Sequence, residues 1–209
     1  MRKRERQPEG NYYDKYHTKN RIEKWLVRHF FRRCGQVLGQ IQIENGTILE
    51  AGCGEGYFTK FLYGKYKGHA KLEAFDISRA CVGQAKAACP GVCFRVGSIY
   101  EIPKGHKYGL VVASEVLEHM EDPARALGQL LGVCGRYLLV TVPNEPLWRI
   151  LNMARGKYWR RLGNTPGHVQ HWNKRTLRKL ILEKGGGKTE VVKAASACPW
   201  FILLVRVRQ

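Results

Sequence analysis

The sequence lacks the long apolar runs that a membrane protein needs. No stretch of the 209 residues approaches the ~20 apolar residues of a membrane-spanning helix, so we expect no transmembrane segment. Residues 1–10 are basic but lead into polar and aromatic residues instead of an apolar region, so we expect no secretory signal. Repeats and low-complexity segments are also missing. What remains is the composition of a globular protein that folds around one sizeable core.

Closely spaced cysteine pairs are missing as well. The seven cysteines form no CxxC pair and no regular framework. An odd number of cysteines scattered through apolar segments is typical of reduced thiols and argues against a disulfide scaffold. We therefore expect a cytoplasmic protein.

Negative charge is scarce at both ends of the chain. Residues 41–147 contain eleven Lys or Arg and eleven Asp or Glu, whereas residues 1–40 contain eleven against four and residues 148–209 fourteen against two. The net charge of +19 therefore comes from the flanks. Such a field attracts nucleic acid, an acidic membrane surface, or a phosphorylated or carboxylated small molecule. It is equally typical of a surface that serves only solubility.

Strand patterns alternate with helix patterns from residue 47 onward. The expected strands cover 47–53, 71–77, 92–98, 108–114 and 136–143, and an antiparallel pair ends the chain. The expected helices between and after them cover 57–66, 78–89, 122–134 and 173–184. Alternating apolar strands and helices predict an α/β, Rossmann-like fold, with a seven-stranded, mostly parallel sheet, helices on both faces and a C-terminal antiparallel hairpin. We expect a single domain over residues 1–209.

A basic amphipathic helix is expected before this alternation, at residues 20–41, within an N-terminal part that we take as 1–41. Apolar residues recur there at helical spacing and predict one buried stripe. The stripe comprises Ile22, Trp25, Leu26, His29, Phe30, Val37, Leu38 and Ile41.

The glycines at 52, 54 and 56 lie between the first strand and the helix after it. Glycine allows a tight turn and a close approach of the backbone to a ligand. Such a run also fits a dinucleotide, and Asp76 lies twenty residues after Gly56, as a ribose-binding carboxylate does in NAD enzymes. However, the pattern is G-x-G-x-G, and Glu50 and Glu55 would repel a pyrophosphate at this turn. Glu50, two residues before the first glycine, is placed to meet an ammonium group instead.

Four segments in order closely resemble the motifs of the class I S-adenosylmethionine-dependent methyltransferases. Residues 50–56 match the E/D-x-G-x-G-x-G pattern of motif I, and the resemblance continues through 75–77, 97–99 and 114–119, within a core of 47–143. The chain also resembles small bacterial methyltransferases of the ubiquinone and menaquinone biosynthesis type. The resemblance implies S-adenosyl-L-methionine as the cofactor.

The resemblance also implies which residues hold that cofactor. Glu50 would meet the methionine end, Asp76 both ribose hydroxyls and Ile77 the adenine ring. Ser98 would meet the adenine edge, where the family more often has Asp. The full set is Glu50, Gly52, Gly54, Gly56, Asp76, Ile77, Ser98, Ile99 and Ser114.

Candidate catalytic residues follow the fourth strand. The expected cleft faces three of them, Glu115, Glu118 and His119. His119 is a candidate general base for a hydroxyl acceptor, because the ordinary pKa of histidine is close to working pH. We take His119 and Glu115 as the catalytic candidates, while a purely structural His119 is the alternative. The segment resembles E-x-x-E-H clusters that bind a divalent metal in some methyltransferases, with His168 or His171 as a further ligand. Two carboxylates and one histidine are not specific for a metal, and we expect none.

Residues 144–172 form a long connection rich in tryptophan and arginine, before the final helix and strand pair at 173–209. Long connections at this edge of an α/β domain are often functional lids. Basic and aromatic residues together suit nucleic-acid bases beside phosphates, or a lipid headgroup region. We expect this lid to bind the acceptor through Trp148, Arg160, Arg161 and His171.

These observations predict a methyltransferase acting on a small or lipid-linked, anionic acceptor, with O-methylation favoured. An RNA methyltransferase is the alternative, because RNA would explain the charge, although no separate RNA-binding module is visible. A non-catalytic binding protein on the same fold is the third hypothesis. The sequence does not indicate an oligomeric state.

Overall fold

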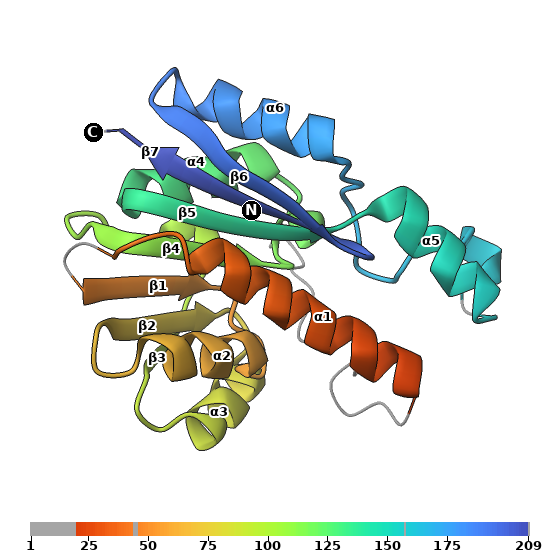
Figure 1. Ribbon diagram of the computed structural model, residues 1–209, viewed down its shortest axis with the longest axis horizontal. Helices are drawn as coiled ribbons and strands as arrows, with labels where there is room; N and C mark the ends of the chain where they lie inside the picture. Colours follow the sequence, from red (N-terminus) through yellow and green to blue (C-terminus); the bar gives the residue numbers. More distant parts are fainter. Residues whose placement is uncertain (1–19, 44–45, 157, 209) are drawn as a thin grey trace, which may run out of the picture.

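A computed structural model describes residues 20–43, 46–156 and 158–208, which form one seven-stranded sheet between two layers of helices (Figure 1). The strands are β1 (Thr47–Ala51), β2 (Lys71–Asp76), β3 (Cys93–Val96), β4 (Tyr108–Ser114), β5 (Cys134–Pro143), β6 (Thr189–Ala197) and β7 (Trp200–Val207). The α-helices are α1 (Arg21–Leu38), α2 (Tyr57–Tyr66), α3 (Arg79–Ala88), α4 (Pro123–Val133), α5 (Glu145–Ala154) and α6 (Lys174–Gly185).

The strand order is β3-β2-β1-β4-β5-β7-β6. Strands β1 to β5 are parallel, and β7 pairs antiparallel with both β5 and β6. The predicted Rossmann-like sheet with a C-terminal hairpin is therefore confirmed. Strand β2 lies on one side of β1 and β4 on the other, so the strand order reverses at β1. Ligands of open α/β sheets bind at the carboxyl ends of the strands beside such a reversal.

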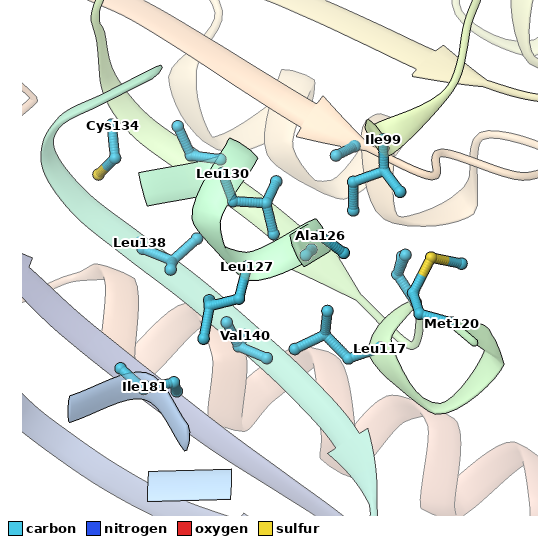
Figure 2. Packing of buried hydrophobic residues seen from close by; sticks show 14 of the residues in the cluster. Ile99, Leu117, Met120, Ala126, Leu127, Leu130, Cys134, Leu138, Val140 and Ile181 are labelled. Carbon is cyan, nitrogen blue, oxygen red and sulfur yellow. The ribbon is translucent and has the colours of Figure 1, made fainter. Parts of the chain in front are cut away.

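Two hydrophobic clusters cover the two faces of the sheet. Helices α4 and α6 pack on one face, where Leu127 and Leu130 lie over Leu138 of β5, with Ile181 alongside (Figure 2). Helices α1, α2 and α3 cover the other face, where the ring of Phe30 lies 5.0 Å from that of Trp200. Because both faces are covered, β4 is buried along almost its whole length, as its continuous apolar sequence predicts.

Side-chain caps fix where the helices begin. Asn20 accepts hydrogen bonds from the amides of Ile22 and Glu23, and Asp122 accepts one from Arg125 before a proline in the first turn of α4. The expected cap at Ser78 is present, and an Asn173–Thr176 capping box begins α6. Each cap satisfies amide groups that lack a partner inside the helix.

Residues 144–172 hold more regular structure than the sequence pattern predicts. Helix α5 follows β5 directly, and a 3₁₀ turn (Trp159–Arg161) comes after it. The inner side of α5 carries Asn152, whose amide nitrogen donates to the Gly163 carbonyl and to the Thr165 hydroxyl. These contacts attach the rest of the connection to the helix.

Helix α1 departs from its expected orientation at its start. Phe30, Val37 and Leu38 are buried as expected, but Ile22 and Trp25 are exposed. Glu23 faces inward instead, because its carboxylate pairs with Arg155 of the segment after α5 at 2.8 Å. Over the described ranges, no helix is both long and apolar enough to cross a membrane.

Candidate cofactor and acceptor site

The turn between β1 and α2 requires glycine. Gly52 and Gly56 have φ angles of +74° and +88°, in the left-handed region that favours glycine. A Cβ atom on Gly52 would lie 2.6 Å from Cγ2 of Val116, and one on Gly56 would lie 2.9 Å from Cβ of Ala85. The turn therefore packs directly against the segment after β4 and against α3.

Glu50 is a buried acid inside β1, just before this turn. Its Oε2 atom has no hydrogen-bond partner within the described residues. Burial raises the pKa of Glu50 to about 8, and the charge of Asp76 adds to the increase. A buried carboxyl with an unused oxygen fits the ammonium group of a methionine moiety, which would stabilise its charged form.

Asp76 is fixed at the end of β2 by two backbone amides. Its Oδ2 accepts a hydrogen bond from Gly54 at 2.8 Å, and its Oδ1 accepts one from Ser78 at 2.9 Å. Each carboxylate oxygen keeps a further lone pair for a ribose hydroxyl. The next residue, Ile77, is 41% exposed, as expected of a residue that would cover an adenine ring.

The adenine-edge residues lie in the turn after β3. The Ser98 hydroxyl accepts a hydrogen bond from the amide of Tyr100 and begins a short 3₁₀ turn (Ile99–Glu101). The side chain of Ile99 is buried in the core. The contacts of both residues with the cofactor stay predictions.

The end of β4 is held in an uncommon conformation. The hydroxyl groups of Ser114 and Thr141 are 2.9 Å apart, and the Glu115 amide donates to the Thr141 carbonyl. Glu115 itself has a φ of +57°, which is uncommon outside glycine and costs strain energy that the surrounding contacts must offset. Burial raises the pKa of the Cys34 thiol in α1, and the charge of Glu115 adds to that effect.

Two histidines and a glutamate converge beyond this point. His119 ends a 3₁₀ turn (Leu117–His119), and its Nδ1 lies 3.0 Å from the Gly167 carbonyl. The Nδ1 of His168 lies 2.6 Å from Oε1 of Glu145, at the start of α5, and the two imidazole rings are 4.9 Å apart. A carbonyl can only accept, so Nδ1 of His119 carries the proton, and its Nε2 is a basic lone pair when the ring is neutral.

The same cluster has the composition of a metal site. The candidate ligand atoms of Glu118, His119 and His168 all lie within 4.8 Å of one another. The Nδ1 atoms of the two histidines contact the Gly167 carbonyl and the Glu145 carboxylate. Metal-binding imidazoles usually make such a contact through the nitrogen that does not bind the metal. The cluster includes neither Glu115 nor His171 as a ligand. Of the two histidines considered from the sequence as a further ligand, His168 is the one brought to His119.

The backbone holds the two halves of this cluster together. The Glu118 carbonyl accepts hydrogen bonds from the amides of both Val169 and Gln170, at 2.9 and 3.0 Å. The Gln170 side chain also donates to the Met120 carbonyl. The segment that carries His168 is therefore fixed to the turn that carries His119.

The expected acceptor residues lie in different environments. The indole nitrogen of Trp148 donates to the Thr165 hydroxyl, and its ring lies 5.6 Å from that of Trp200, so this tryptophan holds α5 in place. Arg160 and Arg161 are exposed on the 3₁₀ turn after α5. His171 is exposed and lines a depression of about 470 Å³. The acceptor contacts of all four stay predictions.

The depression lies between α5 and the segment that leads to α6. Arg149, Ile150, Met153, Leu162 and Trp172 line it beside His171. Glu145, which also lines the depression, is a residue that the sequence patterns did not single out. An acid directly after the fifth strand was the available signal for Glu145, since the carboxyl ends of these strands gather at the site.

Comparisons with known proteins identify the class. A family model described as a methyltransferase domain matches residues 20–186, so the chain belongs to this family. A probable S-adenosylmethionine-dependent methyltransferase of Mycolicibacterium smegmatis is 30% identical over 146 residues, which are 68% of this chain and 52% of that protein. A malonyl-[acyl-carrier protein] O-methyltransferase of Anoxybacillus flavithermus is 30% identical over 40% of this chain and 33% of that protein. The chain thus spans about half of the first relative and a third of the second.

Solved structures share the fold. Magnesium protoporphyrin IX methyltransferase from Synechocystis, solved with S-adenosylhomocysteine, superposes with a TM-score of 0.68 at 20% identity, over 95% of this chain and 91% of that one. The N-methyltransferase NodS of Bradyrhizobium japonicum gives 0.64 at 18% identity, over 91% and 90%. The chain therefore carries a methyltransferase domain with the fold of these enzymes, and the S-adenosylmethionine-dependent relative agrees with the cofactor that the motifs predicted.

Proposed function

We propose that this protein transfers the methyl group of S-adenosylmethionine to an oxygen atom of a small or lipid-linked acceptor that carries an anionic group and an apolar part. The cluster of His119, His168 and Glu145 carries the proposal, because it offers a basic nitrogen. That nitrogen belongs to the segment after β4, in which Val116 packs against Gly52. The acceptor side adds arginines and an apolar depression, which suit such a molecule.

In the proposed reaction the acceptor oxygen attacks the methyl carbon in line with the sulfur. The new carbon–oxygen bond forms as the carbon–sulfur bond breaks, and that electron pair stays on sulfur. The hydroxyl proton passes to Nε2 of His119, and the hydrogen bond from Nδ1 to Gly167 keeps the ring in the required tautomer. Positioning the acceptor supplies most of the remaining rate increase.

A metal-assisted version is the second candidate, and the convergence of Glu118, His119 and His168 favours it. These residues would hold a divalent cation, which would orient the acceptor and lower the pKa of its hydroxyl group. Rigorous chelation distinguishes the versions. Full activity after chelation excludes the cation, whereas loss of activity with recovery on adding one divalent metal favours it.

The experiment that tests the proposal is methyl transfer from labelled S-adenosylmethionine to a panel of phenolic, lipid-linked, sugar and RNA acceptors. We expect label on an oxygen of a phenolic or lipid-linked anion. Label on RNA alone would favour the RNA methyltransferase alternative. Binding of the cofactor without transfer to any acceptor would favour a binding protein.

A further inference from the structure

Large apolar side chains are exposed together at one end of the molecule. The described residues include eight exposed large hydrophobic side chains, and five of them lie in residues 20–29 or 149–162, with exposed fractions between 53% and 69%. We call these two segments the basic tip. Its apolar members are Ile22, Trp25, Ile150, Trp159 and Leu162.

An ion pair brings the two segments of the basic tip together at one end of the molecule. The ion pair between Glu23 and Arg155 joins the start of α1 to the end of α5. Arg149 donates from Nε to the Leu162 carbonyl and so holds the chain after the 3₁₀ turn against α5. Figure 1 shows α1 and α5 projecting from the same end of the sheet.

The exposed charged side chains of the basic tip are cations, and its one acid is buried in an ion pair. The sequence of the two segments contains a single acid, Glu23, and that acid is buried in its ion pair with Arg155. The outward cations are exposed and come from both segments: Arg21, Lys24, Arg28, Arg160 and Arg161. Among the described residues of these two segments, the exposed charges are therefore all positive.

We propose that the basic tip docks on the surface of an anionic lipid bilayer. Cations surrounding exposed tryptophan and aliphatic side chains match the headgroup region, where lipid phosphates meet the arginines and the apolar groups reach the acyl boundary. RNA fits less well, because Ile22, Ile150 and Leu162 offer a nucleic acid no ring for stacking. Ile150 and Leu162 also line the depression proposed for the acceptor, but the docking is measured by vesicle binding alone and does not depend on methyl transfer.

Vesicle sedimentation with the full chain tests the proposal. The wild-type protein should bind vesicles in which about a third of the lipid is phosphatidylglycerol and should bind pure phosphatidylcholine vesicles weakly, with binding reduced by salt. Equal binding to both vesicles, or to neither, overturns the proposal. Binding to single-stranded RNA in place of the anionic vesicles overturns it as well.

Two pairs of matched variants show whether the basic tip is the surface involved. Ile150→Ser with Leu162→Ser should lower partition onto anionic vesicles about tenfold or more, whereas Val96→Ser, at an exposed site on β3, should not. Arg21→Ala with Arg28→Ala should weaken binding more than the equal charge loss of Arg175→Ala with Arg178→Ala on α6. Unchanged binding in the variants of the basic tip, with an unchanged thermal shift by S-adenosylhomocysteine as proof of folding, would refute the assignment.

Discussion

Replacing Glu50 by glutamine should stabilise the protein without cofactor and weaken its binding of cofactor. Glu50 has a pKa of about 8 in the fold and an ordinary value of 4.5. The folded state therefore keeps a proton that the unfolded chain releases between these two values, so stability falls as pH rises through this window. At 1.36 kcal/mol per unit, the upper limit of this cost is about 5 kcal/mol at pH 8.

Glutamine keeps the shape of this side chain and never ionises. Thermal unfolding without ligand should therefore show a higher Tm for Glu50→Gln than for wild type at pH 8, and a smaller difference near pH 5. S-adenosylhomocysteine should bind the variant about 10–100-fold more weakly, because a charge-assisted hydrogen bond contributes roughly 1.5–3 kcal/mol. The wild-type affinity should itself rise between pH 6 and pH 8, as Glu50 becomes easier to ionise.

Calorimetry and thermal unfolding at pH 5, 6, 7 and 8 measure both effects on the same samples. Glu55→Gln is the matched control, since it makes the same chemical change in the same turn at a partly exposed position. Unchanged affinity in Glu50→Gln would show that Glu50 does not meet the ammonium group. A lower Tm for Glu50→Gln than for wild type at pH 8 would show that burial does not hold the Glu50 carboxyl in its neutral form.

Three further predictions concern the remaining residues of the site. Asp76→Ala should weaken binding of S-adenosylhomocysteine by about 2–3 kcal/mol, and NAD should not bind the wild-type protein; calorimetry that finds the reverse preference contradicts the cofactor assignment. His119→Ala should lower kcat about 10²-fold or more with nearly unchanged cofactor affinity, and unchanged turnover would leave His119 a structural role. Arg160→Ala with Arg161→Ala should raise the acceptor KM and leave cofactor binding alone; wild-type acceptor kinetics would show that these arginines are only a solvated surface.

The cofactor half could be predicted from the sequence because its signals are local. The turn at Gly52 and Gly56 depends on neighbours that follow one another in the chain, and Asp76 stands at the end of a strand whose pattern is clear. The sheet order then places both at one edge. Local pattern and fold agree there.

The acceptor half depends on contacts that no local pattern reveals. Glu145 and His168 are 23 residues apart and meet because α5 folds back on the chain that follows it. Glu23 turns inward to Arg155 across 132 residues, and at the start of α1 it takes the buried position that the apolar spacing predicts for Ile22 and Trp25. Trp148 is expected to contact the acceptor because it lies among arginines in the sequence. In the structure its indole nitrogen donates a hydrogen bond to the Thr165 hydroxyl.

The Glu118 carbonyl accepts hydrogen bonds from two backbone amides of the segment that carries His168. This backbone attachment affects which residues of the site can be substituted. Main-chain hydrogen bonds do not depend on side-chain identity, so Val169 can change, proline excepted, without losing this contact, whereas Gln170 also donates from its side chain to the Met120 carbonyl. The exposed lining of the proposed acceptor site is thus free to vary while the backbone keeps His168 beside His119. A library that randomises exposed positions of residues 149–171 and spares His168 should yield altered acceptor selectivity more often than loss of folding.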